Sequence, residues 1–431
     1  MSDTEAPHRG ALELALEPFG SPRFSAALSV VIIGTNFLSY LISRLIGTAG
    51  LLAIVIGLVC FAVLSVLGQR STLEWRGFLP ISLTVFLGWT ALSVFYSQYQ
   101  WLSLGSIAYQ VVITLLGVYV ALARDFIQIV RAVGDVLRVV LGLSLGIEIL
   151  VGVLLDTSFP QLSISGTLAN GGPIQGVMGS RDDLGLVALL ALVTFGTELL
   201  TRSIGRTTAI LSIIASVVTI VLCKSPVNFG VVLVLGLAAL ALLGLRRVPQ
   251  HSQRYWLIGL GALAVAGVIT AYFLRDRILA LLGATGALKF RLSLWHDLFP
   301  FIQVHALEGW GWVGNWPADV APFPAIGAPI QHFSALSAYF DVWFQVGIIG
   351  LFAFLVFVGL AIIKAWVLAT QKRSRIFVWP ALILVALLLT GLTESGILVN
   401  WGWLIVVICS VKCAQHLRWR RPVGASSVDA G

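Results

Sequence analysis

Three basic side chains, Arg181, Lys224 and Arg291, each begin, end or adjoin a predicted helix at the same membrane level. An anionic ligand at that level, such as the diphosphate of a lipid-linked sugar, would need such cations. Arginine in particular offers a planar fork that matches phosphate oxygens. The alternative for each residue is an ordinary snorkelling or lipid-headgroup contact. The three residues are therefore candidate diphosphate-binding groups.

Three tryptophans, Trp310, Trp312 and Trp316, lie in a long predicted loop that is also rich in proline, glycine and histidine. They are typical either of interfacial anchors or of a sugar-contacting surface, because an aromatic face offers an apolar platform to C–H groups. The apolar run from Leu279 to Phe301, which charged residues interrupt, predicts amphipathic helices at the outer interface.

His296, His305 and His332 in the same loop show no metal-binding pattern such as HExxH. Any of them could act as a general base at the pH of the outer compartment, since an unperturbed imidazole titrates near 6.5. The four cysteines form no CxxC pair. No metal site and no cofactor are predicted.

Three acidic residues lie in or beside apolar segments. Glu148 lies in the outer half of its predicted helix, where it indicates either a functional group or a structural pair with a neighbouring helix. Glu198 lies near the inner end of its helix, where we expect it to snorkel. Asp341 opens a later helix and either faces an outer cavity or caps that helix.

The composition identifies the class of protein. The chain of 431 residues is 58% hydrophobic and 11% charged, with a mean hydropathy of +0.97, whereas soluble domains are roughly 25% charged. A soluble fold is thereby excluded. The net charge of +8 comes from small basic groups between apolar runs, so it indicates membrane orientation and no nucleic-acid partner.

The apolar segments predict an all-α polytopic membrane protein with about twelve transmembrane helices, because a spanning helix needs about 20 mostly apolar residues. A tail at 1–24, which is not a signal peptide, precedes helices 1–9 in 25–273. Outer loops follow at 156–182 and 274–336, then helices 10–12 in 337–414 and a tail at 415–431. The segments lie near 25–43, 49–68, 77–96, 103–122, 136–155, 183–200, 207–223, 228–245, 255–273, 337–363, 377–394 and 397–414.

The distribution of basic residues predicts that both termini are cytoplasmic, since short cytoplasmic loops carry an excess of Lys and Arg. Of the 27 Lys and Arg residues, the predicted outer connections carry only Arg44, Arg181, Lys224, Arg275, Arg277, Lys289 and Arg291. We therefore expect a multi-pass protein of the bacterial inner membrane, in contact with membrane lipids.

Three blocks of sequence resemble the O-antigen ligase and O-antigen polymerase superfamily, which includes exopolysaccharide-production polymerases. Gln175–Val193 is similar to the G-x-x-x-[HN]-[KR]-N-x-L-G helix opening of that family. Arg291–Trp312 is similar to R-x-x-x-W followed by a GwG turn, and Ala338–Phe357 is similar to the HNxYLDxxxxxGxxGL helix start, with LTES (Leu392–Ser395) further on. Together the blocks span about half of the chain.

The resemblance implies a membrane glycosyltransferase of the GT-C type. It would polymerise or ligate glycan units from a polyprenyl-diphosphate-linked oligosaccharide on the outer leaflet, passing them to an acceptor glycan or lipid with inversion and without a metal. Arg181, Lys224 and Arg291 would hold the diphosphate, and a histidine would remove the acceptor proton. The tryptophans, Tyr339 and Asp341 would contact the acceptor. Other polysaccharide assembly proteins are possible partners.

Some positions depart from the family pattern. The histidine-asparagine pair falls on Leu336 and Ser337, neither of which can act as a base, so His332, four residues upstream, is the candidate substitute. The asparagine after the basic residue is Asp182 here, and Lys224 in CKSPVN stands in for a lost arginine.

Two alternative functions remain open at this point. The helix number favours a secondary transporter or flippase for lipid-linked or amphipathic solutes, although such a protein would carry charges at the membrane midplane. The missing histidine favours a non-catalytic scaffold of a polysaccharide assembly complex.

Overall fold

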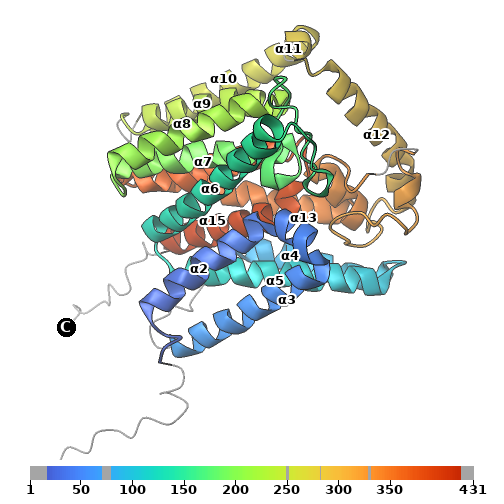
Figure 1. The fold of residues 1–431 in the computed structure, drawn as a ribbon, viewed down its shortest axis with the longest axis horizontal. Coiled ribbons are helices and arrows are strands. Elements are labelled where there is room, and N and C mark those ends of the chain that lie inside the picture. The colour runs from blue at the N-terminus through green and yellow to red at the C-terminus, as the bar shows by residue number, and fades with distance from the viewer. Residues whose placement is uncertain (1–16, 70–78, 249–251, 282, 329–331, 419–431) are drawn as a thin grey trace, which may run out of the picture.

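The computed structural model describes residues 17–69, 79–248, 252–281, 283–328 and 332–418. Every named element in this part of the chain is a helix, as Figure 1 shows. The α-helices are α2 (Pro22–Phe37), α3 (Ser39–Gly68), α4 (Ile81–Tyr96), α5 (Gln100–Ala123), α6 (Phe126–Ile149), α7 (Arg181–Thr201), α8 (Arg206–Cys223), α9 (Pro226–Leu245), α10 (Gln253–Phe273), α11 (Arg275–Leu281), α12 (Thr285–Val304), α13 (Ala338–Gln371), α14 (Val378–Thr390) and α15 (Asn400–Arg418). The short helical turns are η1 (Leu150–Leu154), η2 (Pro160–Leu162), η3 (Gly176–Met178), η4 (Phe323–Ala325), η5 (Arg375–Phe377) and η6 (Gly396–Leu398).

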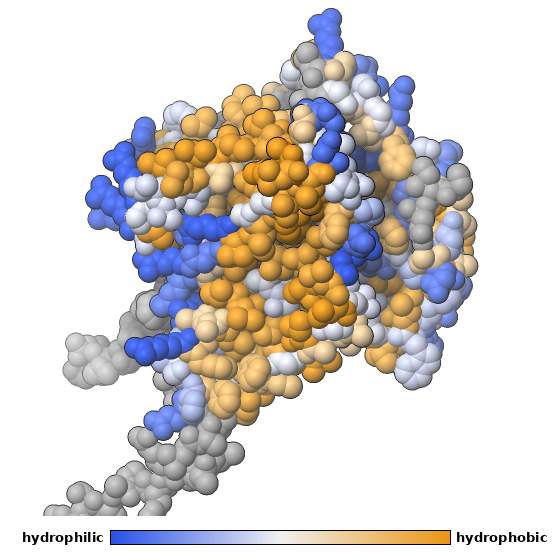
Figure 2. Space-filling model, viewed as in Figure 1, coloured by the Kyte–Doolittle hydropathy of each residue, from blue (hydrophilic) through white to orange (hydrophobic). Residues whose placement is uncertain are grey.

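Seven helices of the described chain are long and apolar enough to cross a membrane, which supports the prediction of a membrane protein. Two shorter apolar helices, Ile81–Tyr96 and Arg375–Thr390, accompany them. Figure 2 shows apolar side chains over the middle of one face, with hydrophilic side chains towards both ends. The seven spans are Ser39–Gly68, Gln100–Ala123, Phe126–Leu154, Arg181–Thr201, Arg206–Cys223, Pro226–Leu245 and Ala338–Gln371.

The predicted boundaries hold for several helices and change for others. The segment expected at 136–155 begins at Phe126, where Asp125 and Gln128 form a capping box. The segment expected at 25–43 ends at Phe37, and the next helix contains a kink at Gly47. Helix α13 continues to Gln371, past the expected end at 363. The predicted tails lie largely outside the described residues, which exclude 1–16 and 419–431.

The charged residues in the first half of α6 have partners in the folded chain. Its first turns carry charged residues that break the apolar run, but Arg138 pairs with Glu198 of α7 and lies 2.9 Å from Asp135. Glu198 is fully buried. The prediction that Glu198 snorkels is therefore wrong: a partner on the neighbouring helix compensates its charge inside the bundle.

Helices α14 and α15 form much of the core. Most of α15 between Trp401 and Ala414 is buried, as is most of α14 between Val378 and Leu387. Helix α7 packs beside them, and the indole nitrogen of Trp379 donates a hydrogen bond to Thr194 at 3.0 Å. This hydrogen bond fixes the first turn of α14 to α7.

The connection between α12 and α13, residues 305–337, is here named the large loop, and the end of the bundle where it lies is the loop end. Figure 1 shows α12 running from α11 to this loop. The connection from α14 to α15 reaches the same end, because the N–H of Ala338 donates to the carbonyls of Gly391 at 2.9 Å and Glu394 at 3.2 Å.

A kink in α13 anchors the large loop. Val346 and Gly347 leave the helical conformation, which frees backbone groups for other partners. The carbonyls of Phe344 and Gln345 accept the N–H groups of Trp310 at 3.1 Å and Gly311 at 2.8 Å. Gln345 also accepts the N–H groups of Val313 and Gly314 at 2.9 Å each through its side chain. Two of the sequence blocks thus meet at this point.

Candidate functional site

Arg291 lies on the buried face of α12. That face carries Arg291, Leu294, Leu298 and Ile302 at helical spacing, so the packing of the leucines draws the arginine into the bundle. Arg291 is only 7% exposed. The guanidinium donates to Oε1 of Glu394 at 2.6 Å and to the carbonyl of Thr393 at 3.1 Å. Arg291 is thereby fixed against the connection between α14 and α15.

Arg181 is the first residue of α7, and Ser180 caps the helix by accepting the N–H groups of Asp182 at 3.2 Å and Asp183 at 3.3 Å. Its side chain is 41% exposed and lies 4.0 Å from Oδ1 of Asp182. The helix dipole favours negative charge at this N-terminus, where Asp182 and Asp183 lie in the first turn. Asn228 of α9 donates to the carbonyl of Asp182 at 3.0 Å, which fixes the two helix starts to each other.

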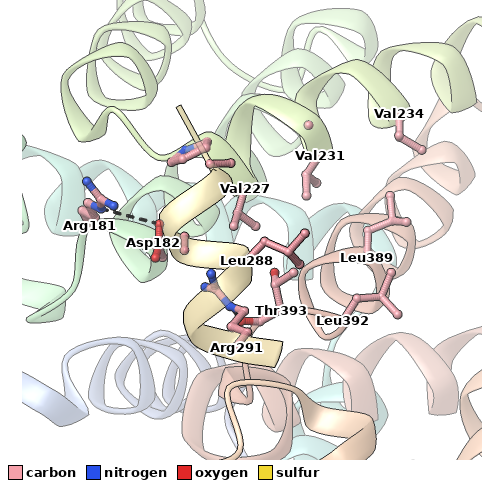
Figure 3. Close-up of a pocket in the computed structure, with 14 residues that line it drawn as sticks. Arg181, Asp182, Val227, Val231, Val234, Leu288, Arg291, Leu389, Leu392 and Thr393 are labelled. Atoms are coloured by element: carbon pink, nitrogen blue, oxygen red, sulfur yellow. Dashed lines mark hydrogen bonds and ion pairs between the residues drawn. The ribbon is translucent and has the colours of Figure 1, made fainter. Parts of the chain in front are cut away.

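Arg181 and Arg291 line one cavity of about 330 Å³, although 110 residues separate them. Figure 3 shows them with Asp182 at one side of the cavity, whereas aliphatic side chains of α9 and α14 extend away from them. The cavity therefore has a charged end and an apolar wall. The complete lining is Arg181, Asp182, Pro226, Val227, Gly230, Val231, Val234, Ala284, Ala287, Leu288, Arg291, Leu389, Leu392 and Thr393.

The carboxyl groups near the cavity affect one another. Burial, together with the neighbouring Asp183 and Asp182, raises the pKa of Glu394 to about 8, although Arg291 acts in the opposite direction. A carboxyl with this pKa keeps its proton at neutral pH in most molecules. The positive charge of Arg291 is then only partly compensated, which suits the binding of an anion.

Asp341 and Tyr339 contact α14 and the connection that follows it. The carboxylate of Asp341 is buried and accepts the N–H of Ala335 at 3.0 Å and the hydroxyl of Ser395. The hydroxyl of Tyr339 donates to the carbonyl of Leu388 at 3.0 Å. Neither residue lines the cavity. Asp341 thus contacts the residue after Glu394, and Tyr339, which is half-buried, contacts the end of α14. The acceptor-contacting role of both residues stays a prediction.

Lys224 is not brought into the cavity. It ends α8 with a positive φ, is exposed, and donates a hydrogen bond to the carbonyl of Gly171. Its neighbours Pro226 and Val227 line the cavity, but the lysine does not. The diphosphate role of Lys224 stays a prediction that the geometry does not favour.

His332 also lies outside the cavity. It is 9% exposed, and its ring centroid lies 5.4 Å from that of Phe290. Burial lowers its pKa, against which a hydrogen bond with Gly327 acts. Nδ1 of His305 lies within hydrogen-bond distance of Oε1 of Glu308, at 2.9 Å, and His296 is exposed. The structure thus places none of the three histidines among the lining residues of the cavity.

The three tryptophans pack into the protein. Trp312 and Trp316 are 0% and 1% exposed, and Trp316 contacts the rings of Phe323 and Phe344. Trp310 is half-buried and donates to the carbonyl of Phe301 at 2.9 Å. In this structure the indoles hold the large loop on α13. The sugar-contacting role of the three tryptophans stays a prediction that this packing does not favour.

The sequence reasoning did not single out Glu394, and it left the role of Glu148 open. Glu394 entered the sequence analysis only as part of LTES. A carboxyl directly after an apolar segment is the signal that could have marked it as a candidate site residue. Glu148 was left open between function and structure. It is buried and accepts the N–H groups of Gln175 at 2.7 Å and Gly176 at 2.8 Å, which indicates a structural anchor for the segment before Arg181.

No protein-family model matches the chain, and no curated protein does either.

The chemistry of the site therefore has to be inferred from its own geometry. The side chains of Arg181, Asp182 and Arg291 lie at one end of a cavity whose other walls are largely aliphatic. Such a cavity can hold an amphipathic anion, with its charged group between the arginines and its hydrocarbon along α9 and α14. The described residues include no group of three His, Cys, Asp or Glu side chains that could hold a metal ion.

Proposed function

We propose that this chain is a membrane glycosyltransferase that takes a glycan from a polyprenyl-diphosphate donor and polymerises or ligates it onto an acceptor glycan or lipid. The observation that carries the proposal is the cavity in which Arg181 and Arg291 meet an aliphatic wall. A diphosphate between the arginines would leave the isoprenoid beside Val227, Val231 and Leu389. The resemblance of three sequence blocks to the O-antigen ligase and polymerase superfamily supports the same assignment.

The arginines would act on the leaving group. An acceptor hydroxyl oxygen would attack the anomeric carbon, the bond from that carbon to the diphosphate oxygen would break, and the configuration would invert. Cations already in place at the departing diphosphate lower the barrier, because charge develops there in the transition state. The acceptor proton would pass to a base, for which the resemblance suggests His332.

The proposal includes a topology. About twelve helices of a GT-C-like arrangement would cross the bacterial inner membrane, with the large loop outside and both termini in the cytoplasm. The loop end would then face the outer leaflet, where lipid-linked glycans are used. Membrane lipids and other polysaccharide assembly proteins would be the remaining partners.

Binding of undecaprenyl diphosphate to the protein in lipid nanodiscs tests the proposal directly. We expect native mass spectrometry to show a bound lipid, and Arg181→Ala and Arg291→Ala each to weaken binding by about tenfold, the loss of one charged contact worth about 1.4 kcal/mol. Arg275→Ala is the matched control, because Arg275 is exposed and does not line the cavity. Equal binding by all four proteins would remove the site assignment.

Transfer is tested separately from binding. Incubation with a polyprenyl-diphosphate oligosaccharide should yield longer or ligated glycan, and Arg291→Ala should abolish it. Binding without any transfer would instead support the scaffold alternative. Uptake of a lipid-linked solute driven by an ion gradient in vesicles would support the transporter.

A further inference from the structure

A group of basic residues lies at the end of the bundle opposite the large loop, and the patch that they form is here named the basic end. Helix α9 ends at Leu245 and α13 ends at Gln371, so the residues just beyond each helix reach this end, where η5 also begins. Figure 2 shows hydrophilic side chains at the end of the molecule away from the large loop. The basic end consists of Arg246, Arg247, Lys372, Arg373 and Arg375.

Arg246 joins the two segments of the basic end. Its guanidinium donates to the carbonyls of Ala369 at 3.2 Å and Lys372 at 3.1 Å, and also to the carbonyl of Arg373. The charge of Arg375 reaches Arg246 as well. The end of α9 therefore lies against the connection from α13 to α14, and the cations of the two segments share one surface.

The positive charges of the basic end have no counter-charge within the described chain. None of its residues forms an ion pair there, whereas Arg138 and Arg291 each pair with a carboxylate elsewhere in the bundle. Arg247, Arg373 and Arg375 are exposed. Like charges that are held close together repel and destabilise the folded state. An anion bound among these cations relieves that repulsion.

The excess of positive charge extends to α15. The charges of Lys372 and Lys412 reach the half-buried His416, as does the charge of Asp125. Lys412 is buried, and its ammonium donates to Gln415 at 3.3 Å but forms no ion pair with a carboxylate of the described chain. A buried ammonium without an acidic partner is costly in a membrane protein, so an anion near this end also benefits Lys412.

Aliphatic side chains adjoin the cations along the same helices. Both α9 and α13 are long and apolar enough to cross a membrane. On α9, the exposed Leu240 and Leu243 precede Arg247 by seven and four residues, which is close to whole helical turns. The cap residue after α9 keeps the helical conformation, so Arg247 lies on the same side as these leucines. On α13, Ile363 is exposed in the turns before the basic end.

This combination fits an anion that also carries hydrocarbon. A guanidinium fork matches phosphate oxygens, and the exposed leucines suit acyl chains, which inorganic phosphate or a nucleotide lacks. We propose that the basic end binds the headgroup of an anionic phospholipid, such as phosphatidylglycerol, in the membrane leaflet at that end, with the acyl chains along α9 and α13. The assignment is independent of the arginine cavity and of the proposed function.

The double variant Arg373→Gln with Arg375→Gln tests this site. Both side chains are exposed and make no hydrogen bond within the described chain, so the fold tolerates the change, and Arg246 is kept because it holds α13. Arg275→Gln with Arg277→Gln is the matched control. It removes the same charge from two exposed residues of α11, which lies away from the basic end (Figure 1).

The probe is phosphatidylglycerol, added in increasing fractions to nanodiscs of neutral phosphatidylcholine, and native mass spectrometry counts the phosphatidylglycerol that stays bound to the protein. We expect the wild-type protein and the control variant to retain it in preference to phosphatidylcholine. The double variant at the basic end should bind it about tenfold or more weakly, since each cation near an anionic lipid contributes about fivefold in affinity. The proposal is overturned if the wild-type protein shows no preference, or if the two double variants bind phosphatidylglycerol equally.

Thermal unfolding distinguishes a lipid headgroup from a free anion. Phosphatidylglycerol should raise the unfolding temperature of the wild-type protein and of the control variant, and should raise that of the basic-end variant less. Inorganic phosphate at millimolar concentration should have no such effect. Stabilisation by inorganic phosphate as large as that by phosphatidylglycerol would show that the basic end takes a free anion, which would overturn the assignment to a lipid.

Discussion

Nη2 of Arg291 lies 2.6 Å from Oε1 of Glu394, and this contact joins α12 to the connection between α14 and α15 across 103 residues of sequence. Both side chains are largely buried, at 9% and 17% exposed. A diphosphate in the cavity would compete with Glu394 for the same guanidinium. This hydrogen bond thus holds two distant segments together, and an anionic ligand of Arg291 has to displace it.

Removing one member of this pair should destabilise the protein more than removing both. At pH 9, where Glu394 is ionised, Arg291→Met leaves its carboxylate among the acidic Asp182 and Asp183. We expect a loss of about 3 kcal/mol at this pH, as is typical when a buried pair is broken. The double variant Arg291→Met with Glu394→Gln should recover more than half of it. Unfolding in a detergent titration measures the four proteins of this cycle.

The exposed pair Arg275 and Asp276, 3.8 Å apart, is the control for that cycle. Exposed ion pairs contribute little to stability, so the cycle Arg275→Met with Asp276→Asn should show no measurable coupling. A coupling at Arg291 and Glu394 as small as at this pair would contradict the structural importance of the buried contact.

Affinity for undecaprenyl diphosphate should fall as pH rises through about 8. Burial raises the pKa of Glu394 to about 8, so below this pH the carboxyl is neutral and leaves the charge of Arg291 for the ligand. Above it, the carboxylate forms, holds Arg291 and repels the diphosphate. Between pH 7 and 9 the dissociation constant should increase, by up to tenfold for each pH unit above 8, in a binding titration.

Glu394→Gln is the control for the pH dependence. The amide keeps the shape of the side chain but carries no titrating proton, so affinity should be flat over this range and higher than that of the wild-type protein at pH 9. A wild-type affinity that does not change between pH 7 and 9 would show that Glu394 does not compete for the arginine.

Gly347→Ala should detach the large loop from α13. Gly347 has a φ of 67°, and an added Cβ would lie 2.0 Å from the carbonyl oxygen of Leu307. We expect a loss of about 3 kcal/mol, since the clash adds to the strain of a positive φ, and faster proteolysis within the loop. Gly359→Ala on the same helix, with no atom within 4 Å, should be neutral or slightly stabilising.

Acidification should loosen the large loop around His332. Burial lowers the pKa of His332 in the folded protein, whereas the unfolded value is about 6.5. Between the two values the unfolded state binds more protons, so stability falls as pH drops below about 6.5. Hydrogen exchange of the peptide that follows His332 should accelerate over this range in the wild-type protein.

His332→Gln should remove this acid dependence, because the variant has no imidazole to protonate. An unchanged pH profile in the variant would show that another group controls the loop. Transfer activity of the same variant is a separate readout. Loss of transfer with undecaprenyl diphosphate binding retained would support His332 as the base.

The sequence by itself determined the class of the protein and singled out three cations, Arg181, Lys224 and Arg291, of which two line the cavity. A chain that is 58% hydrophobic and 11% charged can bury its backbone polar groups in a membrane only as helices or closed barrels, and its apolar runs have helical length. Arg181 and Arg291 were identifiable because an arginine beside an apolar segment is costly and needs a partner.

Only the tertiary structure decided which residues meet. Helical periodicity places Arg291 on the same face as Leu294. It does not predict that the connection after α14 supplies Glu394 as the partner of Arg291. The burial of Trp312 and the position of His332 away from the cavity also follow from how the large loop packs on the kinked α13. The local sequence encodes the periodicity of apolar residues and the length of each helix. Contacts between distant segments depend instead on the packing of the whole bundle.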